Sequence, residues 1–146
     1  MEYKVLDKRL LKTPLMPQII GDAGLDLRSC SSETVTIKKG KSVLISSGIA
    51  VAIPKNWVGL MLPRSGLGIE FGLVLGNTVG VIDSNYRGEI LMSVKNTGDK
   101  ALNIEPMSRI TQLVVVPHYD YSKLELVEEL DSTERGGNGF GHSGTT

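Results

Sequence analysis

Residues 76–90, GNTVGVIDSNYRGEI, are the clearest candidate for chemistry, because they place an acid and an aromatic residue close together. Asp83 directly follows an apolar run that ends at Ile82, and Tyr86 comes three positions later. β-favouring residues interspersed with glycine and asparagine predict a β-hairpin that carries these side chains. A carboxylate held there could activate a water molecule beside a flat or ring-shaped ligand. The same residues also fit an ordinary hairpin in which Asp83 caps its own turn.

A second candidate site is the segment 62–68, LPRSGLG, which follows a predicted strand at residues 57–62. Residues 69–71 are expected to add one or two helical turns, with Ser65 as the N-cap. The start of a helix carries free backbone N–H groups, and Arg64 beside them would complete a site for an anion. A capped turn with a surface arginine is the alternative, and the motif alone does not separate the two.

Asp26 is a third candidate, an acid within the β-like segment 23–29. Leu25 and Leu27 face one side of that strand and Asp26 faces the other, as a period of two requires. The carboxylate is either solvent-facing or an outer partner of Mg²⁺, a cation that keeps several waters and binds substrate phosphates.

Gln112 interrupts the apolar run 110–116, which Arg109 opens. A glutamine at this place is either an ordinary strand-face residue or a donor to an oxygen anion. His118, just after Pro117, has no acid or nucleophile at a spacing that would complete a catalytic triad, so we interpret it as structural.

Many short elements must position these side chains. Turn signals recur about every ten residues and segments with a helical period are nearly absent, which predicts an all-β sandwich or barrel with one short helix. A loop is expected at residues 10–22, where prolines and a glycine cluster. Besides those named above, the expected strands cover residues 3–6, 35–37, 43–45, 49–53, 73–75, 90–94, 101–104, 110–116 and 124–130.

Length, charge and cysteine content limit the function classes. The 146 residues suit one domain, and 16 basic residues balance 16 acidic ones without a basic run, which argues against nucleic-acid binding. Cys30 is the single cysteine, so an internal disulfide is excluded and a reducing, cytoplasmic compartment is expected. The N-terminus does not resemble a signal peptide, and no apolar stretch is long enough to span a membrane.

The C-terminal residues 135–146, RGGNGFGHSGTT, differ from the rest because they hold one apolar residue and five glycines. We expect a β domain of residues 1–134 followed by a flexible arm that a ligand could order. Glycine allows close backbone approach, Phe140 could stack on a ring, and Arg135 could meet a terminal phosphate. A disordered terminus is the alternative.

Five segments occur in a fixed order between residues 23 and 144: AGLDLRS, LPRSGLG, GNTVGVIDSNYRGEI, RITQLVVVP and RGGNGFGHSG. Their order closely resembles the five-motif pattern of the homotrimeric deoxyuridine triphosphatases (dUTP diphosphatases, or dUTPases). The resemblance covers almost the whole chain, and the chain length fits the single-domain trimeric form.

This resemblance implies a distorted jelly-roll fold and the hydrolysis of dUTP to dUMP and pyrophosphate, with Mg²⁺ as the cofactor. It also implies a homotrimer in which each active site combines motifs from three chains. Such an enzyme limits the incorporation of uracil into DNA and supplies dUMP for thymidylate synthesis.

By the same resemblance, the 76–90 segment recognises the nucleoside and activates water. Asp83 matches the acid that activates the water attacking the α-phosphorus. Tyr86 matches the ring that packs under the deoxyribose and leaves no space for a 2′-hydroxyl. The groups that read uracil are matched by Asn77 and by the backbone of Gly80, Val81 and Ile82.

The phosphate-binding residues are also implied by the resemblance. Asp26 matches the acid linked to Mg²⁺ through water, while the ion is held mainly by substrate phosphates. The phosphate-binding turn and a polar side chain near the phosphates are matched by Arg64, Ser65, Gly66 and Gln112. The arm that closes over the γ-phosphate and the uracil is matched by Arg135, Phe140, Gly141, His142 and Ser143.

Two positions depart from the family pattern. Asn85 stands where an aspartate is usual, and His142 stands where serine is common. We expect little loss of activity, because Asn85 should point away from Asp83 and Ser143 still supplies a hydroxyl group.

Two other functions remain open from the sequence. A dCTP deaminase has the same fold but needs different residues for attack at the base. A trimeric regulatory binder could use nucleotide occupancy as a switch without turnover. The expected location is the cytoplasm, or the host cytoplasm or nucleus for a viral protein.

Overall fold

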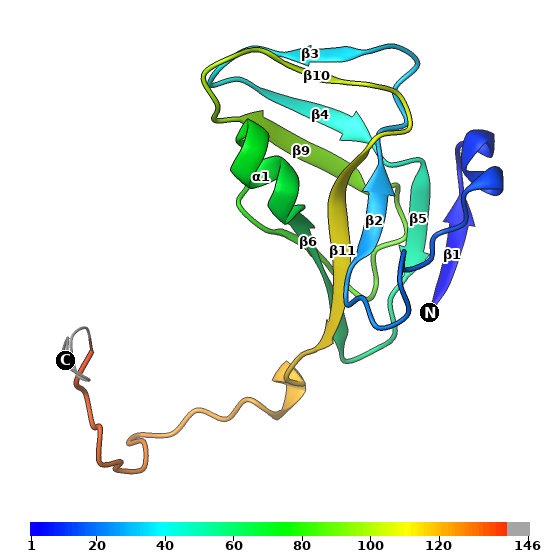
Figure 1. Ribbon diagram of the computed structural model, residues 1–146. Helices are drawn as coiled ribbons and strands as arrows, with labels where there is room; N and C mark the ends of the chain where they lie inside the picture. The colour runs from blue at the N-terminus through cyan, green and yellow to red at the C-terminus, as the bar shows by residue number, and fades with distance from the viewer. Residues whose placement is uncertain (140–146) are drawn as a thin grey trace.

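The computed structural model describes residues 1–139 (Figure 1), and most of its regular structure is short β-strands, which confirms the predicted all-β class. The strands are β1 (Glu2–Val5), β2 (Leu25–Arg28), β3 (Val35–Ile37), β4 (Ser42–Ser46), β5 (Ile49–Ala52), β6 (Trp57–Pro63), β7 (Leu73–Leu75), β8 (Gly80–Ile82), β9 (Leu91–Asn96), β10 (Leu102–Ile104) and β11 (Arg109–Pro117). The helices are α1 (Ser65–Phe71) and the 3₁₀ turns η1 (Lys8–Lys12) and η2 (Tyr121–Lys123). None of the described helices has the length and apolar composition needed to cross a membrane.

The described strands pair in four antiparallel sheets. A four-stranded sheet has the order β2-β11-β6-β8, and a three-stranded sheet has the order β4-β9-β7. β1 pairs with β5, and β10 pairs with β3. The strands of the two larger sheets alternate along the chain, so the connections between them repeatedly cross from one sheet to the other.

Both larger sheets contribute to one core of aliphatic side chains. Leu27 and Leu113 come from the four-stranded sheet, whereas Met92 and Val94 come from the three-stranded sheet. All four side chains are almost fully buried. Burial of a side chain of this size contributes roughly 1.5–3 kcal/mol relative to exposure. The inward-facing residues therefore hold the sheets together, and the strand ends and edges are left to carry polar site residues.

Residues 76–90 do not form the predicted β-hairpin. β7 pairs with β9, whereas β8 pairs with β6, so residues 76–79 cross from one sheet to the other. Residues 83–90 cross back to β9, and a hydrogen bond from the Tyr86 N–H to the Asp83 carbonyl (3.1 Å) closes a turn there. The sequence marked the turns, but the partner of each short strand is decided by longer strands that are remote in the sequence.

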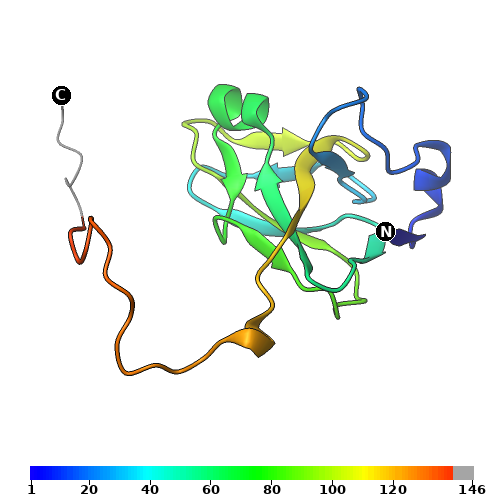
Figure 2. The same ribbon diagram turned by 90° about the horizontal axis from the view of Figure 1, so that it is seen from below.

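The strand predicted at residues 124–130 is wrong. η2 follows β11, and the chain then leaves the β body as an extended segment (Figure 1, Figure 2). Leu124, Leu126 and Leu130 have exposed fractions of 74%, 102% and 86%. Alternating apolar residues form a strand only beside another strand, and no strand within residues 1–139 pairs with this segment.

The predicted N-cap of the short helix is also wrong. Arg64 is the N-cap of α1, and Ser65 is the first helical residue. The Arg64 backbone is extended because β6 continues to Pro63, and no side chain hydrogen-bonds to the helix start. The end of a strand thus places Arg64 directly before the free N–H groups of the helix.

Candidate active site

One group of predicted site residues lines a hollow of about 500 Å³ formed by α1, β2, β11 and the loop before β2. We call it the Arg64 hollow. Arg64, Asp26 and Gln112 lie in its wall, together with Ser65 and Gly66 from the first turn of α1. The structure therefore brings together five of the predicted site residues, which come from three segments that are distant in the sequence.

Asp26 is the centre of the charge pairing in the Arg64 hollow. Arg64 Nε lies 3.0 Å from Asp26 Oδ1, and Arg109 Nη1 lies 3.1 Å from Asp26 Oδ2. The Asp26 side chain is 13% exposed, so water screens these ion pairs only partly. One carboxylate thus holds two guanidinium groups at the wall of the same hollow, where they can bind phosphate oxygens.

Arg109 joins this group through an irregularity in β11. Asp26 pairs with Gln112 in the β2–β11 ladder. Two residues after Asp26 in β2, Arg28 pairs with Arg109, because the register of the ladder shifts between Arg109 and Thr111. Residues three positions apart point to opposite faces of a regular strand, which would separate Arg109 from Gln112. The extra residue, Ile110, turns Arg109 to the face that carries Asp26.

Two hydrogen bonds hold the end of β6 in place. Gln112 Nε2 donates to the Pro63 carbonyl (3.0 Å), and Arg64 Nη1 donates to the Arg109 carbonyl (3.2 Å). Gln112 therefore positions the chain that carries Arg64, in addition to lining the hollow. Sequence reasoning selected Gln112 but missed Arg109, because the register shift leaves no signal in the residue pattern.

The wall of the Arg64 hollow is not positively charged overall. The arginines Arg64 and Arg109 are opposed by Asp22, Asp26 and Glu70. Among residues 1–139, no group of three or more His, Cys, Asp and Glu side chains could hold a metal ion. A triphosphate bound here would need further positive charge, which a divalent cation or another part of the protein could supply.

A second group of predicted residues lines a separate hollow of about 260 Å³, which we call the Asp83 hollow. Asp83 directly follows β8 and is exposed, and Tyr86 as a whole residue is 42% exposed. The other predicted members of this wall are Asn77, Gly80, Val81 and Ile82. The structure thus brings an acid, an aromatic ring and the whole of β8 to one place.

β8 offers backbone groups to a ligand because it is an edge strand. It pairs with β6 on one side only, with Gly80 opposite Met61 and Ile82 opposite Gly59. No strand within residues 1–139 pairs with its other edge. Backbone N–H and C=O groups on such an edge can form hydrogen bonds with a planar ligand, as they would with another strand.

The Arg64 and Asp83 hollows share no lining residue. β6 connects them, since its middle pairs with β8 and its end leads into Arg64. Neither hollow of a single chain therefore combines Asp83 with Arg64, Asp26 or Gln112.

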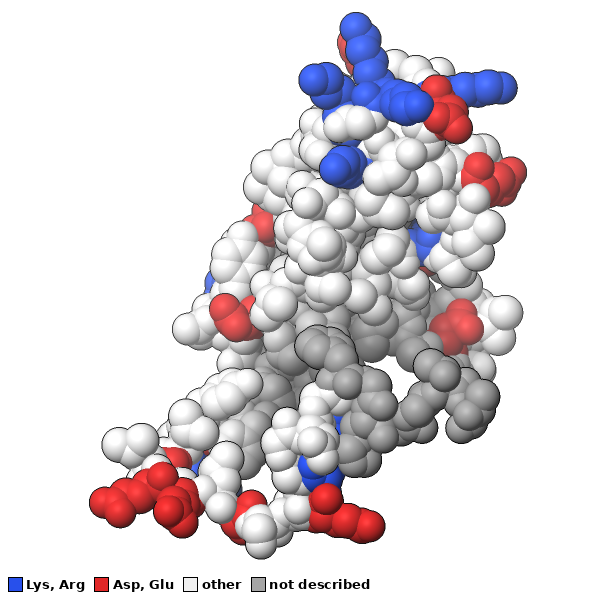
Figure 3. Space-filling model, turned by 90° about the vertical axis from the view of Figure 1, so that its left-hand side faces the viewer, with Lys and Arg blue, Asp and Glu red and all other residues white. Residues whose placement is uncertain are grey.

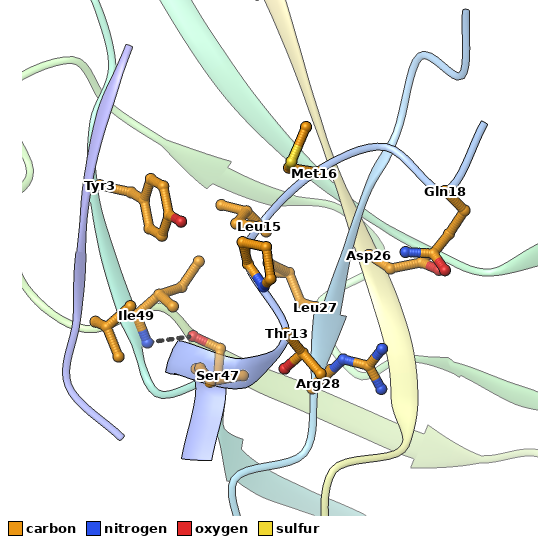
Figure 4. A pocket seen from close by; sticks show the side chains of 13 residues that line it. Tyr3, Thr13, Leu15, Met16, Gln18, Asp26, Leu27, Arg28, Ser47 and Ile49 are labelled. Carbon is orange, nitrogen blue, oxygen red and sulfur yellow. Dashed lines mark hydrogen bonds between the residues drawn. The ribbon is translucent and has the colours of Figure 1, made fainter. Parts of the chain in front are cut away.

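A smaller cavity lies beneath residues 13–16, and Figure 4 shows its lining. Tyr3 and Ile49 lie on one side of it, and Asp26 and Arg28 lie on the other (Figure 4). Its volume of about 30 Å³ gives room for about one or two water molecules and excludes a nucleotide.

The arm residue Arg135 lies in neither hollow. It is exposed, and its guanidinium donates to the carbonyls of Asn138 (2.9 Å) and Gly139 (3.3 Å). Residues 124–134, which lead to it, hold five acids and no lysine or arginine. Figure 3 shows acidic side chains gathered at one end of the molecule and basic side chains at the other. The predicted site residues that lie outside the described part of the chain are Phe140, Gly141, His142 and Ser143.

Two side chains with shifted pKa values lie outside both hollows. Hydrogen bonds from Arg9 lower the pKa of Asp7 to about 2, and burial raises the pKa of the Cys30 thiol to about 11. The thiol therefore stays protonated at neutral pH and is excluded as a nucleophile.

Comparison with known proteins decides the family. The dUTPase family model matches residues 12–144. The chain belongs to the dUTPase family. It is 47% identical to the deoxyuridine 5'-triphosphate nucleotidohydrolase of Acinetobacter baylyi, over 98% of this chain and 97% of the relative. The protein of the same name from Idiomarina loihiensis is also 47% identical, over 98% of this chain and 96% of the relative. The family membership inferred from five ordered motifs is thus confirmed.

Solved dUTPase structures share the fold. The dUTPase of Staphylococcus bacteriophage 80alpha with dUPNHPP has a TM-score of 0.85 at 31% identity, over 98% of this chain and 97% of that chain. Its description states that phage dUTPases control the transfer of virulence genes. The dUTPase of S. aureus phage phi11, described with a structural Mg(II) ion, has a TM-score of 0.75 at 26% identity, over 88% and 96% of the two chains. The expected jelly-roll fold of the family is confirmed.

Proposed function

We propose that this protein is a dUTP diphosphatase that hydrolyses dUTP to dUMP and pyrophosphate by attack of water on the α-phosphorus. The observation that carries the proposal is the Asp83 hollow, where an acid, an aromatic ring and the open edge of β8 line one space. The names of the relatives and the dUPNHPP complex of the phage 80alpha dUTPase support the same substrate.

Uracil is proposed to bind along β8. The backbone groups of Gly80, Val81 and Ile82, with the Asn77 side chain, can match the donors and acceptors on the edge of this base. Cytosine would leave a polar group of the site without a partner, which is the stronger filter. Thymine would be rejected by lack of room for its methyl group, and such a filter supplies about 1–3 kcal/mol.

Asp83 is proposed to act as the general base. Its carboxylate takes a proton from the attacking water while the water oxygen bonds to the α-phosphorus. The bond from that phosphorus to the bridging oxygen breaks, and pyrophosphate leaves. A positioned general base of this kind contributes roughly 10²–10⁴ in rate. The Tyr86 ring beside it would pack under the deoxyribose and exclude a 2′-hydroxyl.

The phosphates are proposed to bind in the Arg64 hollow, to Arg64, to Gln112 and to the backbone N–H groups of Ser65 and Gly66. Each Asp26 oxygen is paired with one arginine and keeps a further lone pair that can accept a hydrogen bond from a metal-bound water. Such an acceptor suits Mg²⁺, which keeps several waters and binds mainly phosphate oxygens. When bound, the ion would stabilise the negative charge that develops on those oxygens.

The complete site is proposed to form in a homotrimer, with the Asp83 hollow of one copy facing the Arg64 hollow of another. Two observations support this arrangement: the hollows share no residue, and the Arg64 hollow lacks the net positive charge that a triphosphate requires. Leu124, Leu126 and Leu130, which are exposed in one chain, would also gain burial against a second copy.

The arm of a further copy is proposed to close the site. Arg135 would meet the γ-phosphate and add the missing positive charge. Phe140 would stack on uracil, and hydrogen bonds to the phosphates would come from Gly141, His142 and Ser143. The reducing cytoplasmic location expected from the single cysteine, Cys30, stays a prediction.

The test is pyrophosphate release from dUTP, dCTP, dTTP and UTP, with Mg²⁺ and after its removal by a chelator. We expect hydrolysis of dUTP, at most trace rates with the other three nucleotides, and loss of activity without the metal. Ammonia release from dCTP would instead assign the chain to the deaminase alternative. Binding of dUTP without turnover would favour a regulatory binder.

A further inference from the structure

Glu89 connects the Asp83 hollow to a remote part of the β body. It is half-buried and lies in the crossing from β8 to β9. Its Oε1 accepts hydrogen bonds from the Ser46 hydroxyl and from the Gly48 N–H (2.9 Å). Ser46 ends β4 and Gly48 lies in the turn that leads to β5, so the carboxylate ties two segments that lie far apart in the sequence.

The backbone of the turn at Gly48 is suited to its hydrogen bond with Glu89. Gly48 has φ +68°, a left-handed conformation that favours glycine. A Cβ at Gly48 would lie 2.8 Å from Asp7 Cβ and 3.0 Å from Leu10 Cδ1, so a side chain could not fit there. The Gly48 N–H also lies 3.1 Å from the Ser46 Oγ, which brings both donors to one carboxylate oxygen.

The other side of residue 89 contacts Tyr86. The Tyr86 hydroxyl donates to the Glu89 carbonyl (2.9 Å), so the tip of the ring is fixed to the backbone of that residue. A Cβ at Gly88 would lie 2.6 Å from the Tyr86 ring carbon Cζ, so the ring packs directly against this glycine. The next N–H in the chain, that of Ile90, donates to the Ile49 carbonyl (2.9 Å) and holds the same peptide plane from the opposite side.

We propose that Glu89 is a positioning residue whose side chain, through its own carbonyl and the Tyr86 hydroxyl, fixes the Tyr86 ring and so sets the discrimination between deoxyribose and ribose. The inference rests on the proposed function, in which this ring packs under the sugar. Rejection of one hydroxyl group requires a ring that cannot tilt, and a misplacement of about 1 Å at such a site can cost about 10²-fold. The anchor at Ser46 and Gly48 removes this freedom.

The anchor needs a hydrogen-bond acceptor and does not need a negative charge. Within residues 1–139, no lysine, arginine or histidine forms an ion pair with Glu89. The two donors are a neutral hydroxyl and a neutral backbone N–H. Glutamine keeps an oxygen at the position of Oε1 and should therefore replace glutamate with little loss.

The test compares four variants of the full-length protein: Glu89→Ala, Glu89→Gln, Tyr86→Phe and the double variant with Glu89→Ala and Tyr86→Phe. The readouts are kcat and KM for dUTP and for UTP. Glu105→Ala is the matched control, because the exposed Glu105 carboxylate also accepts from a hydroxyl, that of Thr34 (2.7 Å), and lines neither hollow.

We expect Glu89→Ala and Tyr86→Phe each to lower the ratio of kcat/KM for dUTP to kcat/KM for UTP by about tenfold, chiefly through faster use of UTP. The ratio in the double variant should fall no further than in the more impaired of the two single variants, because both changes remove the same connection. Glu89→Gln and the Glu105→Ala control should stay within about twofold of the wild-type ratio.

Equal losses on dUTP and UTP in Glu89→Ala would show a merely structural role and overturn the proposal. So would a Glu89→Gln variant as impaired as Glu89→Ala. Tyr86→Phe keeps the proposal testable if Glu89→Ala does not fold, and a wild-type ratio in Tyr86→Phe would overturn it. A wild-type protein that does not hydrolyse dUTP would overturn the proposed function as well, whereas an active wild type with unchanged ratios in the variants would overturn the role of Glu89 alone.

Discussion

The Arg64 hollow and the Asp83 hollow are built from different kinds of interaction. In the Arg64 hollow, the guanidinium groups of Arg64 and Arg109 pair with Asp26, and these arginine side chains are 31% and 35% exposed. In the Asp83 hollow, the β8–β6 ladder fixes the backbone, and the Tyr86 hydroxyl donates a hydrogen bond to the Glu89 carbonyl. Long charged side chains shape the first site, and the backbone shapes the second.

This difference indicates a division of labour between the two hollows. Paired arginines can turn from a carboxylate to a phosphate without a change of fold, so the Arg64 hollow can adapt to a charged ligand. A backbone edge held by a ladder cannot adapt and must select a ligand that fits it. Changes in the Asp83 hollow should therefore alter turnover and selectivity, whereas changes in the Arg64 hollow should alter affinity and its dependence on salt.

The largest effect is expected from Asp83→Asn. The amide cannot accept the proton of the attacking water, so kcat for dUTP should fall by roughly 10²–10⁴. Binding of dUTP, measured by titration, should persist because the β8 edge and the Arg64 hollow are unchanged. A kcat close to that of the wild type would rule out Asp83 as the base.

Removal of residues 135–146 should lower turnover by one or more orders of magnitude and leave the melting temperature and the assembly nearly unchanged. The segment holds one apolar residue and adds little to a core. Ordering it costs on the order of 1 kcal/mol per residue, so only a ligand with both a base and a triphosphate should close it. A chain that lacks only residues 145–146 is the control for the assay and the melting curve. Full activity without the arm, or a collapsed melting temperature, would contradict this role.

Arg109→Met tests the Arg64 hollow, the one of the two hollows that can adapt to a charged ligand. Asp26 would keep Arg64 alone, and the hollow would lose one positive charge. KM for dUTP should rise about tenfold and depend less on ionic strength, with a smaller change in kcat than in Asp83→Asn. Arg28→Met is the matched control, since Arg28 lies opposite Arg109 and donates to the Met107 carbonyl (2.8 Å). A large loss of kcat at unchanged KM would contradict the division of labour.

The position of Arg109 shows which part of the Arg64 hollow could not be predicted from the sequence. The all-β class, the position of Arg64 before a short helix and part of the lining of each hollow follow from local patterns and ordered motifs. The turn of Arg109 toward Asp26 does not, because it depends on one extra residue in the β2–β11 ladder. The partners of β7 and β8 were missed for a similar reason, since pairing is a property of strands distant in the sequence.

The extended segment at residues 124–130 is a second example of structure that could not be predicted from the sequence. Alternation of apolar residues at 124–130 predicted a strand, but a strand also requires a partner, and one chain offers none to the described residues of this segment. Its exposed leucines are the side chains that the proposed contact with a second copy would bury. The division between a β domain of residues 1–134 and an arm of residues 135–146 stays a prediction.

The smallest effect is expected from Asp7→Asn, a change outside both hollows. The pKa of Asp7 is lowered to about 2 by Arg9, so its contribution to stability is present above the ordinary value of 3.8 and is lost as pH falls toward 2. After allowance for solvent screening this contribution is about 1 kcal/mol or less, which corresponds to a shift of roughly 2–4 °C. The variant should melt lower than the wild type at pH 7, and the difference should vanish near pH 2. Its kcat/KM for dUTP should be unchanged, and a loss of activity would show that the two hollows are not the whole site.

The proposed division of the active site between copies is tested most directly by mixing two variants, each nearly inactive when assayed at a dUTP concentration far below the raised KM of Arg64→Ala. Asp83→Asn keeps an intact Arg64 hollow, and Arg64→Ala keeps an intact Asp83 hollow. When the two proteins are unfolded together and refolded at equal concentration, about one quarter of the sites in a random trimer should combine both intact hollows. We expect dUTP hydrolysis to return to about a quarter of the wild-type level in the mixture, while each variant refolded alone stays inactive. A mixture as inactive as its components, or a monomer in sedimentation that hydrolyses dUTP, would contradict the shared site.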